Sequence, residues 1–222
     1  MAEAGRASLA DRSRAWRVAL AAVGGVWAAI ILPFPASDWG DWSWLWIEDI
    51  YDYPLYARIA TAVGDPYIVF GALAGLSFLL IGVALLPDLS GAGWGGRLLA
   101  WLVIAGAPIT ALSYVGAPEQ SPLHFMWGWE GLLLLAIGLA GPVAAITARS
   151  RWPRWVRVLL GLTLLVVVVG VLTFGYWPHG SLVLLAAEAV AVILGAPRGA
   201  GDPHRSAPDA VPSSGRAPRP EG

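Results

Sequence analysis

The sequence predicts an all-α integral membrane protein: a six-transmembrane-helix bundle with an outer interfacial amphipathic helix and a disordered cytoplasmic C-terminal tail. Three observations favour this fold class. First, 57% of the 222 residues are hydrophobic and only 13% are charged, and the mean hydropathy of +0.65 is far from the balance of soluble globular domains. Second, apolar runs long enough to cross a bilayer recur along the chain. Third, arginine is concentrated in alternate connections between these runs.

Six apolar segments approach or reach the length of about 20 residues that a transmembrane helix needs. The first is short and follows the basic stretch RASLADRSRAWR, as the apolar part of a signal peptide does. No small-residue cleavage site follows it, so we interpret it as an uncleaved anchor. Pro66, Pro122 and Pro178 stand where three segments begin, and proline suits the first turn of a helix. The six segments are residues 18–34, 67–86, 98–116, 123–147, 156–176 and 179–196.

The distribution of arginine predicts the orientation in the membrane. All 14 basic residues are arginines, and all but Arg58 fall in the N-terminal segment, the second and fourth connections or the tail. Because positive charge is retained on the cytoplasmic side, we expect both termini in the cytoplasm. The absence of lysine, beside many alanines and glycines, indicates a GC-rich bacterial genome and hence a bacterial cytoplasmic (inner) membrane.

The predicted orientation divides the chain into three parts. Residues 1–17 form a cytoplasmic basic N-terminus, and residues 18–196 form the transmembrane domain. Residues 197–222 are rich in proline, glycine and serine and contain no aromatic residue, so we expect a disordered cytoplasmic tail.

The transmembrane domain includes an outer tryptophan-rich segment, residues 35–66. A helix over residues 38–53 would place Trp39, Trp42 and Trp46 on one stripe beside an acidic stripe, so we expect this helix to lie in the membrane interface. A lid over a pocket is one alternative. Another is a divalent-cation site, because neighbouring carboxylates can share a hard cation. Its ligands would be Glu48, Asp49 and Asp52.

Composition and motifs exclude several classes of function. The chain has no cysteine, which excludes disulfides, thiolate nucleophiles and zinc ribbons. Its net charge of −1 provides no basic field for nucleic acid. It contains no HExxH, P-loop or GxSxG motif. We therefore expect no metal and no cofactor, and we expect the lipid bilayer and an apolar small molecule as partners.

Two glutamates interrupt apolar segments and are the first candidates for chemistry. Glu130 follows His124 by about 9 Å of helix. Glu188 lies in the last segment, which also begins at the outer side, so we expect the two carboxyls at comparable depth. Acidic residues inside a membrane face the bundle interior and mark functional sites. We therefore take Glu130, Glu188 and His124 as candidate catalytic residues, with a simple contact between helices as the alternative reading of each glutamate.

Aromatic residues near Glu130 provide candidate ligand contacts. A tryptophan face stabilises a cation when water is excluded. Trp129 directly precedes Glu130, and Trp127 lies three residues before it. Because they are two residues apart, at most one shares its side of a helix. We expect Trp101 and Tyr114 to complete the ligand-binding set from the third segment.

Three functions remain open at this stage. The first is binding of a lipid-like or apolar ligand, or of a membrane partner, within the bundle. The second is an enzyme acting on an isoprenoid or lipid, such as a terpene cyclase or isomerase, with Glu130 as general acid. The third is a proton-coupled carrier that uses Glu130 and Glu188. Whether the chain is an enzyme is left open.

A stripe of small residues on the second segment indicates close helix packing. Gly71, Gly75 and Gly82 include a GxxxG pattern, which brings helix backbones together in membranes. The packing can lie within one chain or between two copies. A homodimer through these three glycines is therefore expected as a possible assembly.

Overall fold

The computed structural model describes residues 2–36, 50, 52–148 and 152–197. Within these residues it contains helices and turns and no strand, which confirms the all-helical class. The helices are α1 (Ala2–Ile31), α2 (Pro33–Ala36), α4 (Pro54–Val63), α5 (Pro66–Ala92), α6 (Trp94–Val115), the 3₁₀ turn η2 (His124–Met126), α7 (Trp129–Thr147), α8 (Arg154–Gly161), α9 (Thr163–Phe174) and α10 (His179–Gly195).

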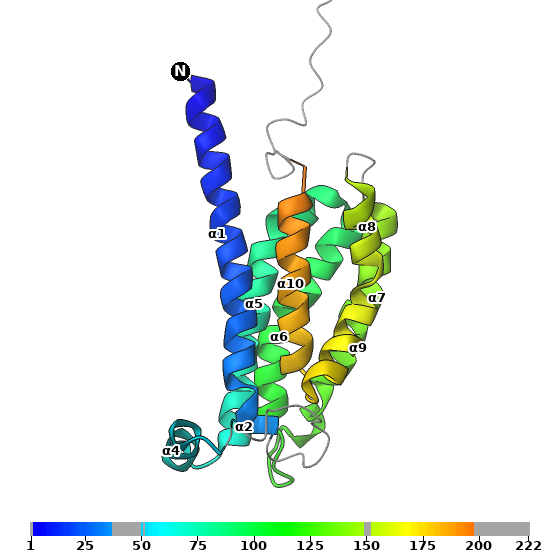
Figure 1. Ribbon diagram of the computed structural model, residues 1–222. Helices are drawn as coiled ribbons and strands as arrows, with labels where there is room; N and C mark the ends of the chain where they lie inside the picture. The colour runs from blue at the N-terminus through cyan, green and yellow to red at the C-terminus, as the bar shows by residue number, and fades with distance from the viewer. Residues whose placement is uncertain (1, 37–49, 51, 149–151, 198–222) are drawn as a thin grey trace, which may run out of the picture.

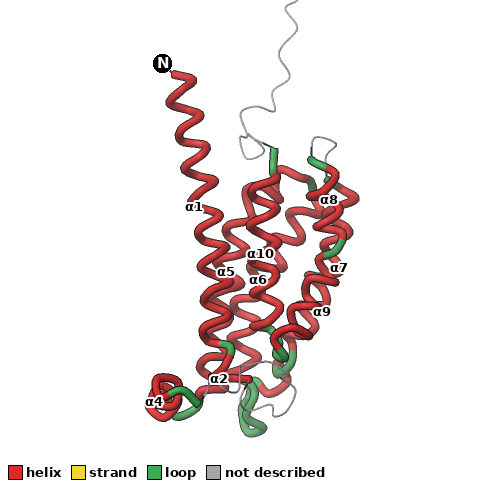
Figure 2. Tube along the Cα trace, viewed as in Figure 1, coloured by secondary structure: helices red, strands yellow, loops and turns green. Residues whose placement is uncertain are grey.

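The helices form a closed ring in chain order (Figures 1 and 2). α1 packs on α5 and α10, α5 packs on α6, α6 on α7, α7 on α8 and α9, and α9 on α10. Successive helical segments run in opposite directions. We call the end that carries the N-terminus and the end of α10 the terminal end, and the end that carries α4 and η2 the loop end.

Four helical stretches have the length and composition needed to cross a membrane. They are Asp11–Ala36, Pro66–Ala92, Trp94–Val115 and His124–Thr147, and they correspond to the first four predicted segments. A fifth crossing is obtained if α8 and α9 count as one, although the two are bent by 56° relative to each other. α10 is apolar but has 17 residues and is shorter than the other four. The described residues therefore contain four helices, or up to five, whose length and composition suit a membrane crossing.

Small residues bring α5 and α6 into close contact. A Cβ added at Gly71 would lie 2.0 Å from the Tyr114 ring, and one at Gly75 would lie 2.6 Å from the Ala107 carbonyl oxygen. At Gly82 it would lie 2.5 Å from Ile104. The predicted glycine stripe is thus occupied by α6 of the same chain. These glycines do not present a free face to a second copy, which corrects the expected dimer contact.

The described part of the loop end contains a short helix, α4, that was not predicted and that lies crosswise to the bundle (Figure 1). The predicted interfacial helix over 38–53 falls almost wholly outside the described residues, as does its cation-site alternative at Glu48 and Asp49, so both stay predictions. α4 is attached to α1 through the Tyr56 hydroxyl, which donates to the Ile30 carbonyl oxygen at 2.9 Å. Leu55 on α4 is exposed, as expected for a helix at a membrane surface.

The start of α7 also differs from the prediction. Gly128 adopts a positive φ of 83°, which favours glycine and separates the η2 turn from α7. Pro122 precedes this turn and begins no long helix, whereas Pro66 does stand at the start of α5. Glu130 is consequently the second residue of α7 and not two turns inside the helix.

Candidate functional site

Glu188 is held at the point where the α8–α9 segment breaks. Its side chain extends from the middle of α10 and is 7% exposed. The Glu188 Oε1 atom lies 2.7 Å from the hydroxyl oxygen of Thr163. Thr163 is the first residue of α9 and is 1% exposed. The Glu188 carboxyl, inside the bundle, therefore contacts the first residue of α9 at the bend between α8 and α9.

The hydrogen bonds around Thr163 bear on the protonation of Glu188. The Thr163 hydroxyl oxygen also lies 2.8 Å from the carbonyl oxygen of Leu160. A hydroxyl has one hydrogen, and a carbonyl oxygen can only accept. When Thr163 donates to Leu160, the contact with Glu188 Oε1 is a hydrogen bond only if Glu188 carries a proton. Both contacts of the Thr163 hydroxyl can be hydrogen bonds at the same time only when Glu188 is neutral.

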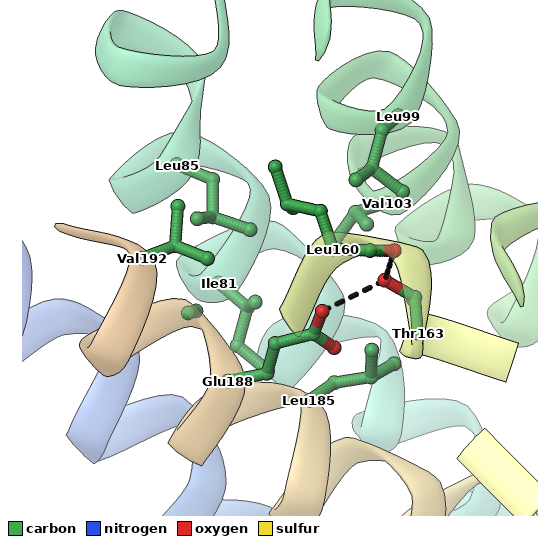
Figure 3. A pocket seen from close by; sticks show the side chains of 10 residues that line it. Ile81, Leu85, Leu99, Val103, Leu160, Thr163, Leu185, Glu188 and Val192 are labelled. Carbon is green, nitrogen blue, oxygen red and sulfur yellow. Dashed lines mark hydrogen bonds between the residues drawn. The ribbon is translucent and has the colours of Figure 1, made fainter. Parts of the chain in front are cut away.

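Glu188 lines a cavity between the helices (Figure 3). Glu188 Oε2 is buried and has no hydrogen-bond partner. The cavity measures about 20 Å³ and is apolar except for Thr163 and Glu188. Such a volume holds one water molecule but no lipid. Its apolar walls come from α5, α6, α8 and α10, and include Ile81, Leu85, Leu99, Val103, Leu160 and Val192.

Glycines leave room for the bent α8–α9 segment to pack closely against α7 and α10. A Cβ at Gly141 on α7 would lie 2.3 Å from the Thr163 hydroxyl oxygen, and one at Gly138 would lie 2.6 Å from Leu164. On the other side, a Cβ at Gly170 would lie 2.6 Å from the Gly180 carbonyl oxygen. The broken segment therefore fits against α7 and α10 because these positions lack side chains.

Glu130 is in a different environment. It is 4% exposed and accepts a hydrogen bond from the Ser113 hydroxyl of α6. The same hydroxyl oxygen accepts from the Gly128 backbone N–H at 2.9 Å. Glu130 thus connects the start of α7 to α6, and a carboxylate is favoured in the first turn of a helix. It is not among the residues that line the Glu188 cavity.

The two glutamates lie at different depths, contrary to the expectation from sequence. α7 and α10 both start at the loop end (Figure 1). Glu130 is the second residue of α7, and Glu188 is the tenth residue of α10. At the rise of an α-helix this separates them by about 12 Å along the bundle. A proton shared directly between the two carboxyls is therefore excluded.

The predicted aromatic site is not assembled. Trp127, Trp129 and Trp101 have exposed fractions of 49%, 44% and 57%, so they face the surroundings of the bundle. His124 stacks on Trp127 with ring centroids 5.7 Å apart, and its Nδ1 lies 3.1 Å from the Gly116 carbonyl oxygen. These residues form part of the loop-end surface and do not surround Glu130.

Tyr114, the fourth predicted ligand residue, belongs to a buried cluster at the loop end. Its hydroxyl lies 2.7 Å from the hydroxyl of Tyr176, and its ring contacts Tyr67 of α5. His179 lies beside Tyr176, is fully buried, and donates from Nε2 to the Phe70 carbonyl oxygen at 3.2 Å. The cluster connects α5, α6 and α10 on the loop-end side of the cavity.

Several residues of the interior were missed in the sequence analysis. Thr163 and Ser113 were not recognised as partners of the glutamates, because a hydroxyl in an apolar segment is common and carries no positional signal. Asp88 lies beyond the predicted second segment, yet it is 3% exposed and forms an ion pair with Arg17. The interruption of the apolar run LLPDLS by an acid was the available signal.

No protein family, curated protein or solved structure matches the chain. Within the described residues, no group of three or more histidine or acidic side chains is placed to hold a metal ion. The buried polar side chains of the bundle are therefore the features that bear on function.

Proposed function

We propose that this chain is a proton-coupled membrane carrier whose proton-binding group is Glu188. The observation that carries the proposal is that Glu188 lines a cavity beside a helix break, and that its buried Oε2 atom has no hydrogen-bond partner. Ionisable groups inside membranes mark proton and ion pathways, because they are too costly to retain as inert contacts.

The broken helix supports the same function. Interrupted helices are tolerated at membrane depth where the freed backbone is buried in protein or lines a cavity. In transporters such interruptions place carbonyl groups and helix ends at the ion-binding site. Here the break brings the Thr163 hydroxyl to the Glu188 carboxyl, and the same hydroxyl contacts the Leu160 carbonyl oxygen. A deprotonated Glu188 can only accept from Thr163, whereas a protonated Glu188 can donate to it, so the hydrogen bonds at the break would change with proton binding.

The proposed membrane arrangement has six crossings in a bacterial cytoplasmic membrane, with both termini in the cytoplasm. The fifth crossing is the bent α8–α9 segment, and the sixth is α10, whose 17 residues extend over about 26 Å. The terminal end carries Arg14, Arg97 and Arg154, whereas Arg58 lies in α4 at the loop end. The positive-inside rule therefore places the terminal end in the cytoplasm.

The carrier is favoured over the two other functions on the size and place of the cavity. A lipid-like ligand or an isoprenoid needs several hundred Å³, and the Glu188 cavity has about 20 Å³. The cyclase hypothesis needs tryptophans around Glu130, and Trp127 and Trp129 face outward.

Infrared difference spectroscopy of the protein in lipid vesicles tests the proposal. Between pH 4 and 9 we expect the wild type to gain and lose a carboxylic acid C=O band, and we expect Glu188→Gln to lose that band. Glu130→Gln is the matched control, because it removes the other buried glutamate and leaves the cavity unchanged.

A second measurement connects the band to transport. In vesicles with an imposed pH gradient and a pH-sensitive dye inside, proton entry should fall to the level of empty vesicles in Glu188→Gln. Entry should remain within about twofold of wild type in Glu130→Gln. Identical pH-difference spectra for wild type and Glu188→Gln would show that Glu188 does not titrate, and the proposal would then be wrong.

A further inference from the structure

An arginine clamp joins three helices at the terminal end of the bundle. Arg17 of α1 forms a partly buried ion pair with Asp88 of α5. One turn earlier in α1, the Arg14 Nη2 atom donates to the Ala196 carbonyl oxygen at 2.7 Å, immediately after α10. Asp88 also experiences the charge of Arg14. We call Arg14, Arg17, Asp88 and the Ala196 carbonyl the arginine clamp.

The clamp lies directly beyond the Glu188 cavity. On α5, Leu85 lines the cavity and Asp88 follows within one helical turn. On α10, Val192 lines the cavity and Ala196 follows by about one turn. Both clamp contacts are therefore on the terminal-end side of the cavity. They hold α1 against the two helices between which a path to that end would open.

The Arg17–Asp88 ion pair leaves one buried hydrogen-bond donor unbonded, which lowers the free-energy cost of separating the two side chains. The Arg17 Nε atom is buried and has no hydrogen-bond partner. The free-energy cost of moving two charges out of water is offset only when their remaining donors and acceptors are also hydrogen-bonded. Separation of Arg17 from Asp88 would return the unbonded Nε to water, so part of the lost attraction is offset by hydration.

Two adjacent glycines on α1, Gly24 and Gly25, lie between the clamp and the loop end. A Cβ at Gly25 would lie 2.6 Å from the Ala186 Cβ, and one at Gly24 would lie 3.1 Å from Ile81. α1 is thus tightly packed at this level, next to the cavity-lining Ile81. Pairs of small residues are places where helices bend. The start of α1 extends beyond the bundle at the terminal end (Figure 1), whereas Arg14 and Arg17 are in contact with the other helices.

We propose that the arginine clamp is the gate of the Glu188 cavity toward the terminal end, and hence toward the cytoplasm. Closed, the Arg17–Asp88 pair and the Arg14–Ala196 contact hold α1 over α5 and α10. Open, α1 bends at Gly24 and Gly25, and water reaches Glu188 from that end. This inference rests on the proposed function, since it names the control of access to the same proton-binding group.

The absence of cysteine from the chain makes a direct test possible. Ala189→Cys places one thiol in the cavity, at a residue that is 1% exposed. Its reaction with a charged, membrane-impermeant thiol reagent is followed in inside-out and right-side-out vesicles of the full-length protein. Adding Arg17→Gln or Asp88→Asn should raise the labelling rate at least about tenfold from the cytoplasmic side, because opening becomes a populated state.

Two controls separate a gate from general loosening. Ala144→Cys on α7 is also fully buried but does not line the cavity, so its labelling should remain slow when Arg17→Gln is added. The charge exchange Arg17→Asp with Asp88→Arg should return the Ala189→Cys rate toward that of the unmodified clamp.

An unchanged Ala189→Cys rate in both clamp variants would overturn the gate, and so would equal acceleration at Ala144→Cys or acceleration from the outer side alone. These outcomes are distinguishable from failure of the proposed function. Labelling reports access to the cavity whether or not Glu188 titrates, and the infrared spectra report titration whether or not the clamp opens.

Discussion

Glu130 and Glu188 are both buried, but the two carboxyls differ in the hydrogen bonds that neighbouring hydroxyls make to them. At Glu130, the Ser113 hydroxyl donates to the carboxyl and accepts from the Gly128 N–H, so each of its hydrogen-bonding roles is used. At Glu188, the Thr163 hydroxyl contacts both Glu188 Oε1 and the Leu160 carbonyl oxygen, and Glu188 Oε2 has no hydrogen-bond partner. Glu130 therefore has the environment of a helix contact, and Glu188 that of a group able to exchange a proton.

Thr163 provides the prediction at this scale. Thr163→Val keeps the shape of the side chain but removes the hydroxyl, leaving Glu188 Oε1 and the Leu160 carbonyl without this partner. We expect a loss of about 1–3 kcal/mol in the free energy of unfolding, together with a shift of the Glu188 carboxyl band. Thr163→Ser retains the hydroxyl and should keep the band near its wild-type position. The measurements are thermal unfolding in detergent and infrared spectroscopy, and an unshifted band in Thr163→Val would contradict the hydrogen-bond assignment.

Among the elements, the α5–α6 pair shows how glycine determines helix spacing. The side chain of Tyr114 occupies the space beside Gly71, and the Ala107 backbone occupies the space beside Gly75. The sequence indicated a close-packing stripe on this segment, but the pattern is the same for a contact within the chain and between chains. Only the folded arrangement identifies α6 as the partner.

Gly71→Ala tests this packing. The added Cβ would lie 2.0 Å from the Tyr114 ring, so the ring or a helix must shift, and we expect a loss of about 1–3 kcal/mol in the free energy of unfolding. Gly131→Ala is the matched control in α7, because its Cβ would meet nothing closer than Trp177 at 4.0 Å. That variant should be stabilised by up to about 1 kcal/mol through helix propensity. Equal thermal shifts for the two variants would show that the space beside Gly71 is not restrictive.

At the scale of the whole molecule, the alternation of helix directions and the distribution of arginine agree with each other. Helices α1, α5, α6 and α7 cross the bundle in alternate directions, and so do the bent α8–α9 segment and α10 (Figure 1). In the proposed arrangement of six crossings, the start of α1 and the end of α10 are on one side, at the end that carries Arg14, Arg97 and Arg154. An odd number of crossings would place an arginine-rich end outside, against the positive-inside rule.

Reporter fusions test this topology. Fusions at Ser8, at Gln120 and at Ser213 should report the cytoplasm, the outside and the cytoplasm, respectively. The Gln120 fusion is the internal control, since it depends only on the first three crossings. An outside signal at Ser213 would mean that α8–α9 or α10 does not cross, and the six-crossing arrangement would then be wrong.

The sequence by itself determined the class of molecule and the positions of its long helices. Continuous apolar length is a local property, so the first four segments could be predicted from residues 18–147 within a few positions at most ends. The break at Leu162 could not, because residues 158–172 are apolar apart from Thr163 and its only local signal is Gly161. The bend depends on space beside Gly141 and Gly138 of another helix.

The tertiary structure decided which buried groups meet. The intramembrane glutamates were recognisable from sequence because charge in an apolar run is conspicuous, but their partners Ser113 and Thr163 were not. A hydroxyl has little effect on hydropathy, and its role depends on helix rotation and depth, which follow from side-chain packing across the bundle. For the same reason Arg17 and Asp88, seventy-one positions apart, could be paired only in the folded chain.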